Sequence, residues 1–283
     1  MKKIAKNIHL ETAYPGVSLG AINLEHGAVL IDSPPRSDDA RAWQASLQEA
    51  GINKYYFLVN LDGHPDRTIG ARSMNANVMA HEFTQEIFDS RSSMFKAQNV
   101  QSGAEWETCS GLSGTRWLPP NISYSQDLTI HSKNNLVVLE YHPGPSAAAT
   151  WVDIPSRKVL FVGDSVTINQ PPFLSDALIE DWIISLDLLQ SDRYIDYQIV
   201  SSRGGIVSSS DIQDMQKFLL QVKKGLSPIG KRKSKPETTA KLVPKLLDKF
   251  KFSSTHLELY TNRIRYGLHH YYSKKYLPAS GTK

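Results

Sequence analysis

The sequence contains very little cysteine, and Cys109 is its single thiol. One cysteine excludes an internal disulfide framework. Cys109 lies in a loop rich in serine and glycine, with no histidine near it in the sequence. A catalytic thiol is normally activated by such a base, so we interpret Cys109 as a passive thiol.

Long apolar runs are absent as well. No stretch approaches the ~18 apolar residues of a membrane span. The segment after Lys2, Lys3 and Lys6 lacks the uninterrupted apolar stretch of a signal peptide. With 40% hydrophobic and 21% charged residues, the composition is typical of a globular protein that buries a sizeable core as one domain with an appendage. We therefore expect a cytoplasmic protein without a membrane partner.

Three short motifs of catalysis and nucleotide binding are also missing from the sequence. There is no Gly-x-Ser-x-Gly turn, which excludes the usual nucleophilic serine elbow. There is no Gly-x-x-x-x-Gly-Lys-Ser/Thr loop and no Gly-x-Gly-x-x-Gly turn after a strand. The sequence therefore suggests no nucleotide cofactor.

The loop at residues 60–70, Asn-Leu-Asp-Gly-His-Pro-Asp-Arg-Thr-Ile-Gly, is the most informative part of the chain. Its spacing resembles the His-x-His-x-Asp-His motif of the metallo-β-lactamase superfamily, in which one loop supplies ligands to two adjacent metals. His64 and Asp66 match that motif. Asp62 replaces a histidine with another possible ligand, and Arg67 stands at the fourth ligand position. Arginine stays protonated at any useful pH and cannot bind a metal.

The surrounding elements follow the order expected for that superfamily. Residues 8–34 have the turn signals of hairpin strands and end in Asp32 and Ser33. Residues 37–50 carry apolar side chains at helical spacing. Strand-type runs follow at residues 55–59, 135–140, 148–152 and 159–164. The resemblance implies an α/β (α+β) fold, a four-layer αββα sandwich of the metallo-β-lactamase type with a C-terminal helical extension.

The later ligand positions of the superfamily can be located one at a time. Asp164 follows an apolar run and Gly163, and it resembles the carboxylate that bridges the two metals. The third histidine position holds Pro145, and the last one holds Arg203. His142 precedes Pro145 on the same loop. It either reaches the site by a different loop path or hydrogen-bonds within its own loop.

Arg67 and Arg203 fall at the two histidine positions of the same metal. Without that metal, converging buried carboxylates would repel one another and take up protons. Two guanidinium groups can neutralise them, with bidentate hydrogen bonds in place of coordination bonds. The sequence therefore predicts a salt-bridged core at the second metal position, formed by these arginines with Asp66 and Asp164.

One function left open by the sequence is metal-dependent hydrolysis. Asp62, His64, Asp164 and His142 would hold at most one divalent metal, which is zinc, manganese or iron. The metal would activate water for hydrolysis of an ester, thioester or amide. Asp66 would orient that water as general base.

The other open function is binding without catalysis. A metal-free relative would bind an anionic small molecule or a protein, with Arg67 and Arg203 as the recognition groups for the anion. Under either function, Phe173 and Trp117 are expected to line an apolar substrate pocket.

Basic residues are concentrated in the chain after residue 222. We expect a metallo-β-lactamase-like domain over residues 1–222, a basic linker over 223–236 and a C-terminal helical extension over 237–283. Apolar and tyrosine side chains in the extension follow helical spacing, so it should pack on the body or on a second subunit, as in a homodimer. Basic and aromatic residues also suit nucleic acid, but a net charge of +4 is a weak footprint for that partner.

Overall fold

The structure is a computed structural model that describes residues 1–96, 101–133 and 135–277, and it contains two β-sheets. The strand order is β1-β2-β3-β4-β5-β6-β7 in the first sheet and β13-β12-β11-β10-β9-β8 in the second. The first sheet consists of β1 (Lys2–Ala5), β2 (Ile8–Glu11), β3 (Leu19–Leu24), β4 (Gly27–Ile31), β5 (Tyr55–Val59), β6 (Asn77–His81) and β7 (Ile122–Tyr124). The second consists of β8 (Asp127–Ser132), β9 (Asn135–Tyr141), β10 (Thr150–Ile154), β11 (Val159–Phe161), β12 (Gln198–Ser201) and β13 (Gly205–Ile206).

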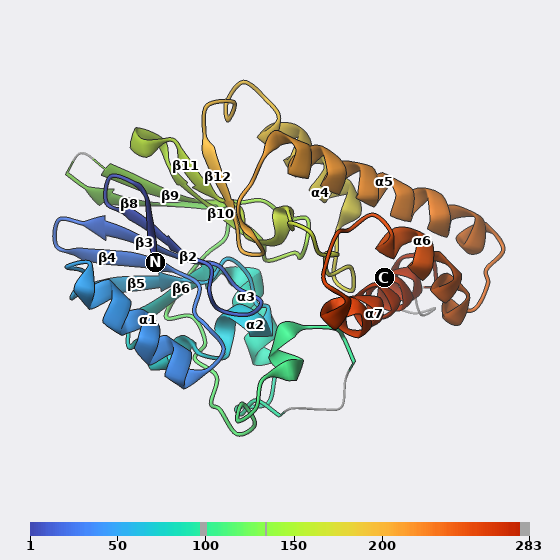
Figure 1. The fold of residues 1–283 in the computed structure, drawn as a ribbon, viewed down its shortest axis with the longest axis horizontal. Coiled ribbons are helices and arrows are strands. Elements are labelled where there is room, and N and C mark those ends of the chain that lie inside the picture. The colour runs from blue at the N-terminus through green and yellow to red at the C-terminus, as the bar shows by residue number, and fades with distance from the viewer. Residues whose placement is uncertain (97–100, 134, 278–283) are drawn as a thin grey trace.

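Helices cover the outer faces of both sheets. The α-helices are α1 (Ser37–Glu49), α2 (Pro65–Thr68), α3 (Glu82–Asp89), α4 (Ile179–Leu189), α5 (Ser209–Lys231), α6 (Val243–Leu247) and α7 (Leu257–Tyr276). Short 3-10 helices lie at Ala71–Met74, Glu105–Thr108, Pro155–Arg157, Gly163–Ser165, Pro236–Leu242 and Ser254–His256. Figure 1 shows α1 against the first sheet, and α4 and α5 against the second.

Burial explains why these elements form layers. In α1, the buried Ala40, Trp43 and Leu47 recur at helical spacing, so a single face packs on the first sheet. A second core lies between the sheets, where Ile31 of β4 and Phe161 of β11 belong to one buried cluster. A third joins the second sheet to α4 and α5. The predicted four-layer αββα sandwich with C-terminal helices is confirmed.

The loops that carry the candidate site residues leave the carboxyl ends of parallel strands. Strand β4 pairs in parallel with β5, and β11 pairs in parallel with β12. Parallel neighbours end at the same edge of their sheet, and ligand sites in α/β folds form at such edges. The loop after β5 and the turns after β11 and β12 can therefore converge.

The basic segment differs from its expected form as a linker. Helix α5 runs without a break to Lys231, so most of residues 223–236 is helical. The reason is apolar periodicity, because Val222 and Leu226 remain buried in the same core as the rest of α5. The sequence marked this segment as a linker through its lysines, glycine and proline, although Pro228 lies inside the helix.

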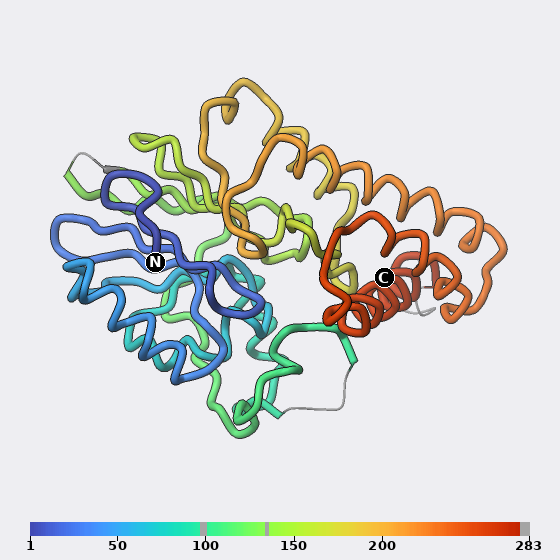
Figure 2. The backbone as a smooth tube through the Cα atoms, in the orientation of Figure 1, coloured from blue at the N-terminus to red at the C-terminus, as the bar shows by residue number. Residues whose placement is uncertain are grey.

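The C-terminal extension packs on the body of the protein. Side chains of α7, including Ile264, Leu268 and Tyr272, belong to the cluster that also contains α4 and α5. Within this extension α7 is one long helix, whereas residues 236–247 are divided between a 3-10 helix and α6. Figure 2 shows α7 on the side of the molecule away from the N-terminus.

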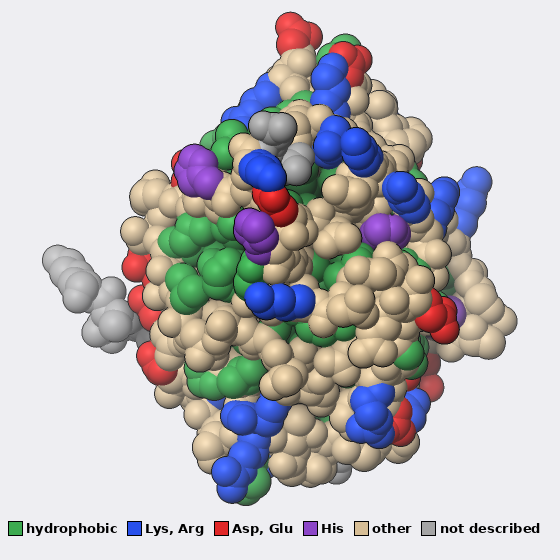
Figure 3. Space-filling model, turned by 90° about the vertical axis from the view of Figure 1, so that its left-hand side faces the viewer, with side chains coloured by type: hydrophobic (Ala, Val, Ile, Leu, Met, Phe, Trp, Pro, Cys, Tyr) green, Lys and Arg blue, Asp and Glu red, His purple; other side chains and the backbone are tan. Residues whose placement is uncertain are grey.

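The outer surface gives little further indication of a partner. On the left-hand side of the molecule in Figure 1, basic side chains lie at several separate places among apolar and acidic ones (Figure 3). Within the part of the chain that the structure describes, none of the helices combines the length and apolarity needed to cross a membrane.

Candidate functional site

The candidate site is assembled from the ends of four strands. Asp32 follows β4, the loop at residues 60–70 follows β5, and Asp164 and Arg203 follow β11 and β12. Asp32 adopts a left-handed backbone conformation with φ of 57°, which is uncommon for a residue other than glycine. Its carboxylate is fixed by hydrogen bonds from the backbone of Leu61 and the hydroxyl of Ser202.

Arg67 lies at the centre of this site with a side chain that is 0% exposed. Its Nη2 donates to Asp164 Oδ1, and its Nε lies 3.3 Å from Asp62 Oδ1. Its Nη1 donates to Ser202 Oγ at 3.3 Å and lies 3.6 Å from Asp32 Oδ2. The guanidinium therefore occupies the space between three carboxylates from three different loops.

Arg203 is also 0% exposed and bridges a second set of carboxylates. Its Nε lies 3.0 Å from Asp164 Oδ2, and its Nη2 lies 3.0 Å from Asp66 Oδ2. Its Nη1 donates to Glu105 Oε2 at 2.8 Å. Asp164 thus pairs with both arginines, one at each oxygen. The ion pairs expected for Arg67 and Arg203 from the sequence are present.

A third arginine, Arg263 of α7, extends the network into the C-terminal extension. Its Nη2 donates to Glu105 Oε1 at 2.5 Å, and its Nε donates to the carbonyl oxygen of Gly103 at 2.8 Å. Burial opposes the charged form of Glu105, but Arg263 and Arg203 outweigh it and lower the pKa of that carboxyl to about 2. Glu105 therefore joins two buried guanidiniums.

The remaining carboxyl groups respond differently to burial. Burial raises the pKa of Asp32 to about 7 even though Arg67 is near. Burial also raises the pKa of Asp66 to about 7 in spite of Arg203. Burial acts on Asp164 as well, but its contacts with Arg203 and Arg67 hold its pKa well below the usual range. Burial therefore favours the neutral forms of Asp32, Asp62 and Asp66, whereas the two arginines favour the charged form of Asp164.

These shifts bring the charges of the network close to balance. The carboxyl groups with a raised pKa take up protons more readily, which reduces the negative charge, as expected for carboxylates that share a site. The network consists of five carboxyl groups and three guanidiniums, namely Asp32, Asp62, Asp66, Glu105 and Asp164 with Arg67, Arg203 and Arg263.

The donor atoms that a metal would need are already engaged. Both oxygens of Asp164 face arginines. Asp62 Oδ1 accepts from the backbone N–H of His64 at 2.7 Å and lies next to Arg67. In the described ranges, no group of three or more His, Cys, Asp or Glu side chains is arranged to hold a metal ion. The residues present therefore do not fit a metal of the superfamily type, because guanidinium groups lie where it would bind.

His142 lies apart from the other candidate ligands. Its Nε2 is 3.3 Å from Glu140 Oε2, and its ring stacks on Trp151 with centroids 3.8 Å apart. It does not belong to the residues that line the cavity beside Asp62 and Asp164. His142 therefore makes a local hydrogen bond, as in the second of the two alternatives above. Its position does not suit a metal ligand at Asp62 and Asp164.

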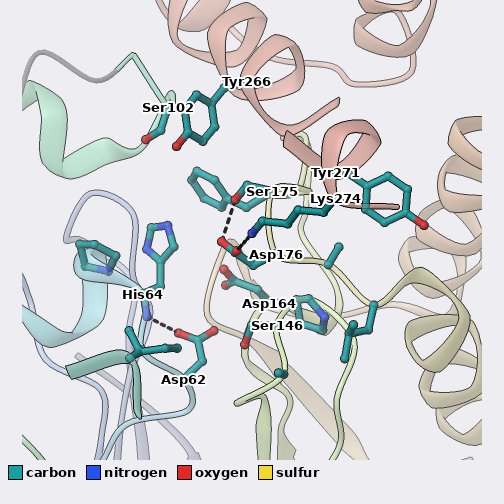
Figure 4. A pocket seen from close by; sticks show the side chains of 18 of the residues that line it. Asp62, His64, Ser102, Ser146, Asp164, Ser175, Asp176, Tyr266, Tyr271 and Lys274 are labelled. Carbon is teal, nitrogen blue, oxygen red and sulfur yellow. Dashed lines mark hydrogen bonds and ion pairs between the residues drawn. The ribbon is translucent and has the colours of Figure 1, made fainter. Parts of the chain in front are cut away.

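A cavity of about 950 Å³ opens above the ion network. Asp62, His64 and Asp164 lie on its floor, and Tyr266, Tyr271 and Lys274 of α7 lie on the opposite side (Figure 4). Its walls also include Phe173, as expected from the sequence, together with Ile87, Phe95, Trp106, Ala177 and Leu178. The C-terminal helix therefore forms part of the cavity wall.

Trp117 was expected in this wall but lies elsewhere. Its ring packs edge-on against Phe88 and Phe95, with centroids 5.5 Å and 5.3 Å away, in a small separate core. Trp106 lines the cavity instead. The prediction for Trp117 was wrong because the aromatic packing that draws it inward involves residues from a distant part of the chain.

Sequence reasoning missed Glu105 and Arg263. Glu105 begins a short 3-10 helix far from every motif, and nothing in the sequence indicates its partner. Arg263 did carry a signal, because it falls within the apolar stripe of α7, between the buried Tyr260 and Gly267. An arginine at such a position must be paired when it is buried.

Replacement of Arg263 by methionine should loosen the attachment of α7. Glu105 keeps Arg203 as a partner, so we expect a loss of about 1.5–3 kcal/mol, the contribution of hydrogen bonds to a charged group. Urea unfolding and amide hydrogen exchange in α7 would measure it. Arg265→Met is the matched control, since Arg265 is an exposed neighbour on the same helix. Equal stability of the two variants would contradict the structural role of Arg263.

Comparison with solved structures finds the same fold in several proteins. A metallo-β-lactamase from Pontibacter korlensis matches with a TM-score of 0.57 and 19% identity, over 77% of this chain and 97% of that one. The metallo-β-lactamase DIM-1 matches with a TM-score of 0.59 and 19% identity, over 78% of this chain and 96% of that one. No family model matches the sequence.

A third match includes the C-terminal helices. The inverting sec-alkylsulfatase Pisa1 from Pseudomonas sp. aligns with 96% of this chain at a TM-score of 0.67 and 13% identity. The alignment covers 49% of the alkylsulfatase, so this chain spans about half of its length. At these identities the likeness concerns the fold. The chain has the fold of the metallo-β-lactamase superfamily.

Proposed function

We propose that this protein is a metal-free, non-hydrolytic member of its fold that binds a small molecule in the cavity above the ion network. One observation carries the proposal, which is the position of the Arg67 and Arg203 guanidiniums among the carboxylates. Each guanidinium engages carboxylate oxygens that a metal ion would need, and its positive charge would repel a cation placed beside it.

The single-metal hydrolase receives less support from the geometry. It needs Asp66 as a general base in contact with water, but that side chain is 0% exposed. One of its oxygens accepts from the backbone of Trp106, and the other pairs with Arg203. A general base must lie within hydrogen-bond reach of the proton that it removes. Asp66 lies beneath the cavity floor and lacks that access.

Recognition of an anion by the two arginines is not supported either. Arg67 and Arg203 are both 0% exposed, and carboxylates of the protein already face them. An anion at this position would meet Asp62 and Asp164 on the floor of the cavity. The cavity itself supports ligand binding, because its volume of about 950 Å³ is within the usual range for small-molecule sites.

Metal content tests the proposal directly. The purified protein and an Asp164→Ala control would be incubated with zinc, manganese or iron, desalted and measured by inductively coupled plasma mass spectrometry. We expect no bound metal in the native protein beyond that of the control. A stoichiometric metal that the control loses would contradict the proposal and support a single-metal hydrolase.

A further inference from the structure

His64 forms part of the cavity floor, and its ring orientation is set by the protein. It is the N-cap of α2, and its Nδ1 accepts a hydrogen bond from the backbone N–H of Asp66 at 3.2 Å. Arg203 Nη2 lies 3.3 Å from the same nitrogen. Both neighbours are donors, so Nδ1 must be the acceptor of the ring. The hydrogen of the neutral imidazole is therefore on Nε2.

The Nε2–H group has no partner within the described part of the chain. The side chain of His64 is 19% exposed and lines the cavity, and Figure 4 shows its ring beside the space enclosed by the α7 residues. Phe173 packs on the ring with centroids 4.4 Å apart. Phe173 is itself held between the guanidiniums of Arg203 and Arg263, at 4.6 Å and 4.3 Å from its centroid. The donor is thus pre-positioned.

Most of the charges near this donor are compensated. Arg203 and Arg263 face carboxylates of the network. On the opposite wall, Lys274 pairs with Asp176, and Lys275 lies 3.6 Å from Glu180. Arg91 and Lys96 also line the cavity and have no carboxylate partner in the described part of the chain, although Arg91 donates to the carbonyl oxygen of Gly63 and packs on Phe88 and Trp117. An anion next to His64 would lie close to the carboxylates of Asp62 and Asp164 on the same floor, which is costly in a partly buried site.

The walls between the floor and α7 are mainly apolar or aromatic. Ile87, Trp106 and Phe173 form one part, and Ala177 and Leu178 form another. Such walls bind the body of an organic molecule, while a few polar groups fix its orientation. A hydrogen-bond donor at the end of an apolar cavity matches a carbonyl oxygen.

We propose that the cavity binds an uncharged organic molecule with an apolar or aromatic body and a carbonyl oxygen that accepts a hydrogen bond from His64 Nε2–H. The proposal rests on the metal-free function above, because a metal ligated by His64 would take a ring nitrogen. The expected ligand is then a neutral carbonyl compound rather than an anion.

Matched neutral and anionic probes test this assignment. Binding of naphthamide and naphthoate, and of indole acetamide and indole acetate, would be measured by protein-observed NMR on the full chain. We expect each amide to bind more tightly than its acid, because the two differ mainly in charge. Histidine side-chain nitrogen shifts should report the Nε2–H tautomer of His64 and a change at Nε2 when the amide binds.

Two variants separate the hydrogen bond from the shape of the cavity. His64→Phe keeps a ring but removes the donor, and we expect it to bind the amides about tenfold more weakly, the effect of one lost hydrogen bond. His64→Gln keeps one donor and one acceptor, and it should retain most of the affinity. Far-ultraviolet circular dichroism would establish that both variants are folded.

Several outcomes would overturn the proposal. These are acids that bind as tightly as the amides, amides that bind His64→Phe as tightly as the native protein, or no binding of either amide. Metal content measured on the same samples distinguishes the two levels of failure. A metal-bound protein would overturn the proposed function, whereas a metal-free protein that ignores the amides would overturn only the ligand assignment.

Discussion

Replacing Arg203 with methionine is expected to lower the free energy of unfolding by about 3–5 kcal/mol, the usual effect of removing one partner from a buried ion pair. Arg203 is 0% exposed and contacts Asp66, Glu105 and Asp164. Methionine fills part of the volume but supplies no charge and no donor. Among the described residues, Asp66 would keep no arginine partner, and Asp164 would keep Arg67.

Urea unfolding monitored by circular dichroism would measure this loss. Arg41→Met is the control, because Arg41 is a 68% exposed arginine that pairs with Asp38 on the surface. Exposed pairs contribute below about 1 kcal/mol. If Arg203→Met were as stable as Arg41→Met, the buried network would not stabilise the fold as its geometry indicates.

A double variant distinguishes loss of charge from loss of packing. Asp66→Asn in the Arg203→Met background removes a buried carboxylate that no longer has its partner. We expect it to recover part of the lost stability, because a neutral amide avoids the cost of burying either a carboxylate or the proton that it must take up. Recovery would be absent if Arg203 acted mainly by filling space.

The fold could be predicted because its signals are local. The strand that ends in Asp32, the amphipathic helix after it and the loop at residues 60–70 each carry a pattern within a short window. Arg67 and Arg203 could be placed together because the ligand spacing of the superfamily relates positions far apart in the sequence. Their ion pairs follow from elementary electrostatics once the positions are known, since buried carboxylates require a counter-charge.

The rest of the site could not be predicted because it depends on segments without a pattern. Glu105 reaches the network from a single short 3-10 turn, and only the tertiary structure places it between Arg203 and Arg263. Trp106, not the expected Trp117, lines the cavity wall, and this too depends on the tertiary structure. Aromatic composition indicates that a pocket is present, but the packing of each ring decides which face it occupies.

The position of α7 changes what the ion network can do. In the described ranges, Arg263 links α7 to Glu105, and Tyr266 and Tyr271 of the same helix line the cavity. The charges that stabilise the floor therefore also hold one wall in place. The cavity and the ion network share residues, so substitutions in the network should alter both stability and the affinity for the proposed ligand.

Replacing both Arg67 and Arg203 with histidine is expected to create a metal site. The two imidazoles would join Asp66 and Asp164, and four nitrogen and oxygen ligands suit zinc. Removal of the guanidiniums also frees the carboxylate oxygens that they now engage. Zinc should then bind the folded double variant and raise its melting temperature. At a zinc concentration 100-fold above Kd, binding would stabilise the folded state by about 2.7 kcal/mol.

Zinc titration followed by thermal unfolding and by mass spectrometry would test this expectation. The matched control is Arg67→Gln with Arg203→Gln, which removes the same two charges but adds no imidazole. Zinc should stabilise the histidine pair and leave the glutamine pair and the native protein unchanged. If zinc bound all three equally, the guanidiniums would not be what excludes it. If zinc bound none of them, the carboxylates would not have the geometry of a metal site. Restoring the two histidines would then not be enough to restore metal binding.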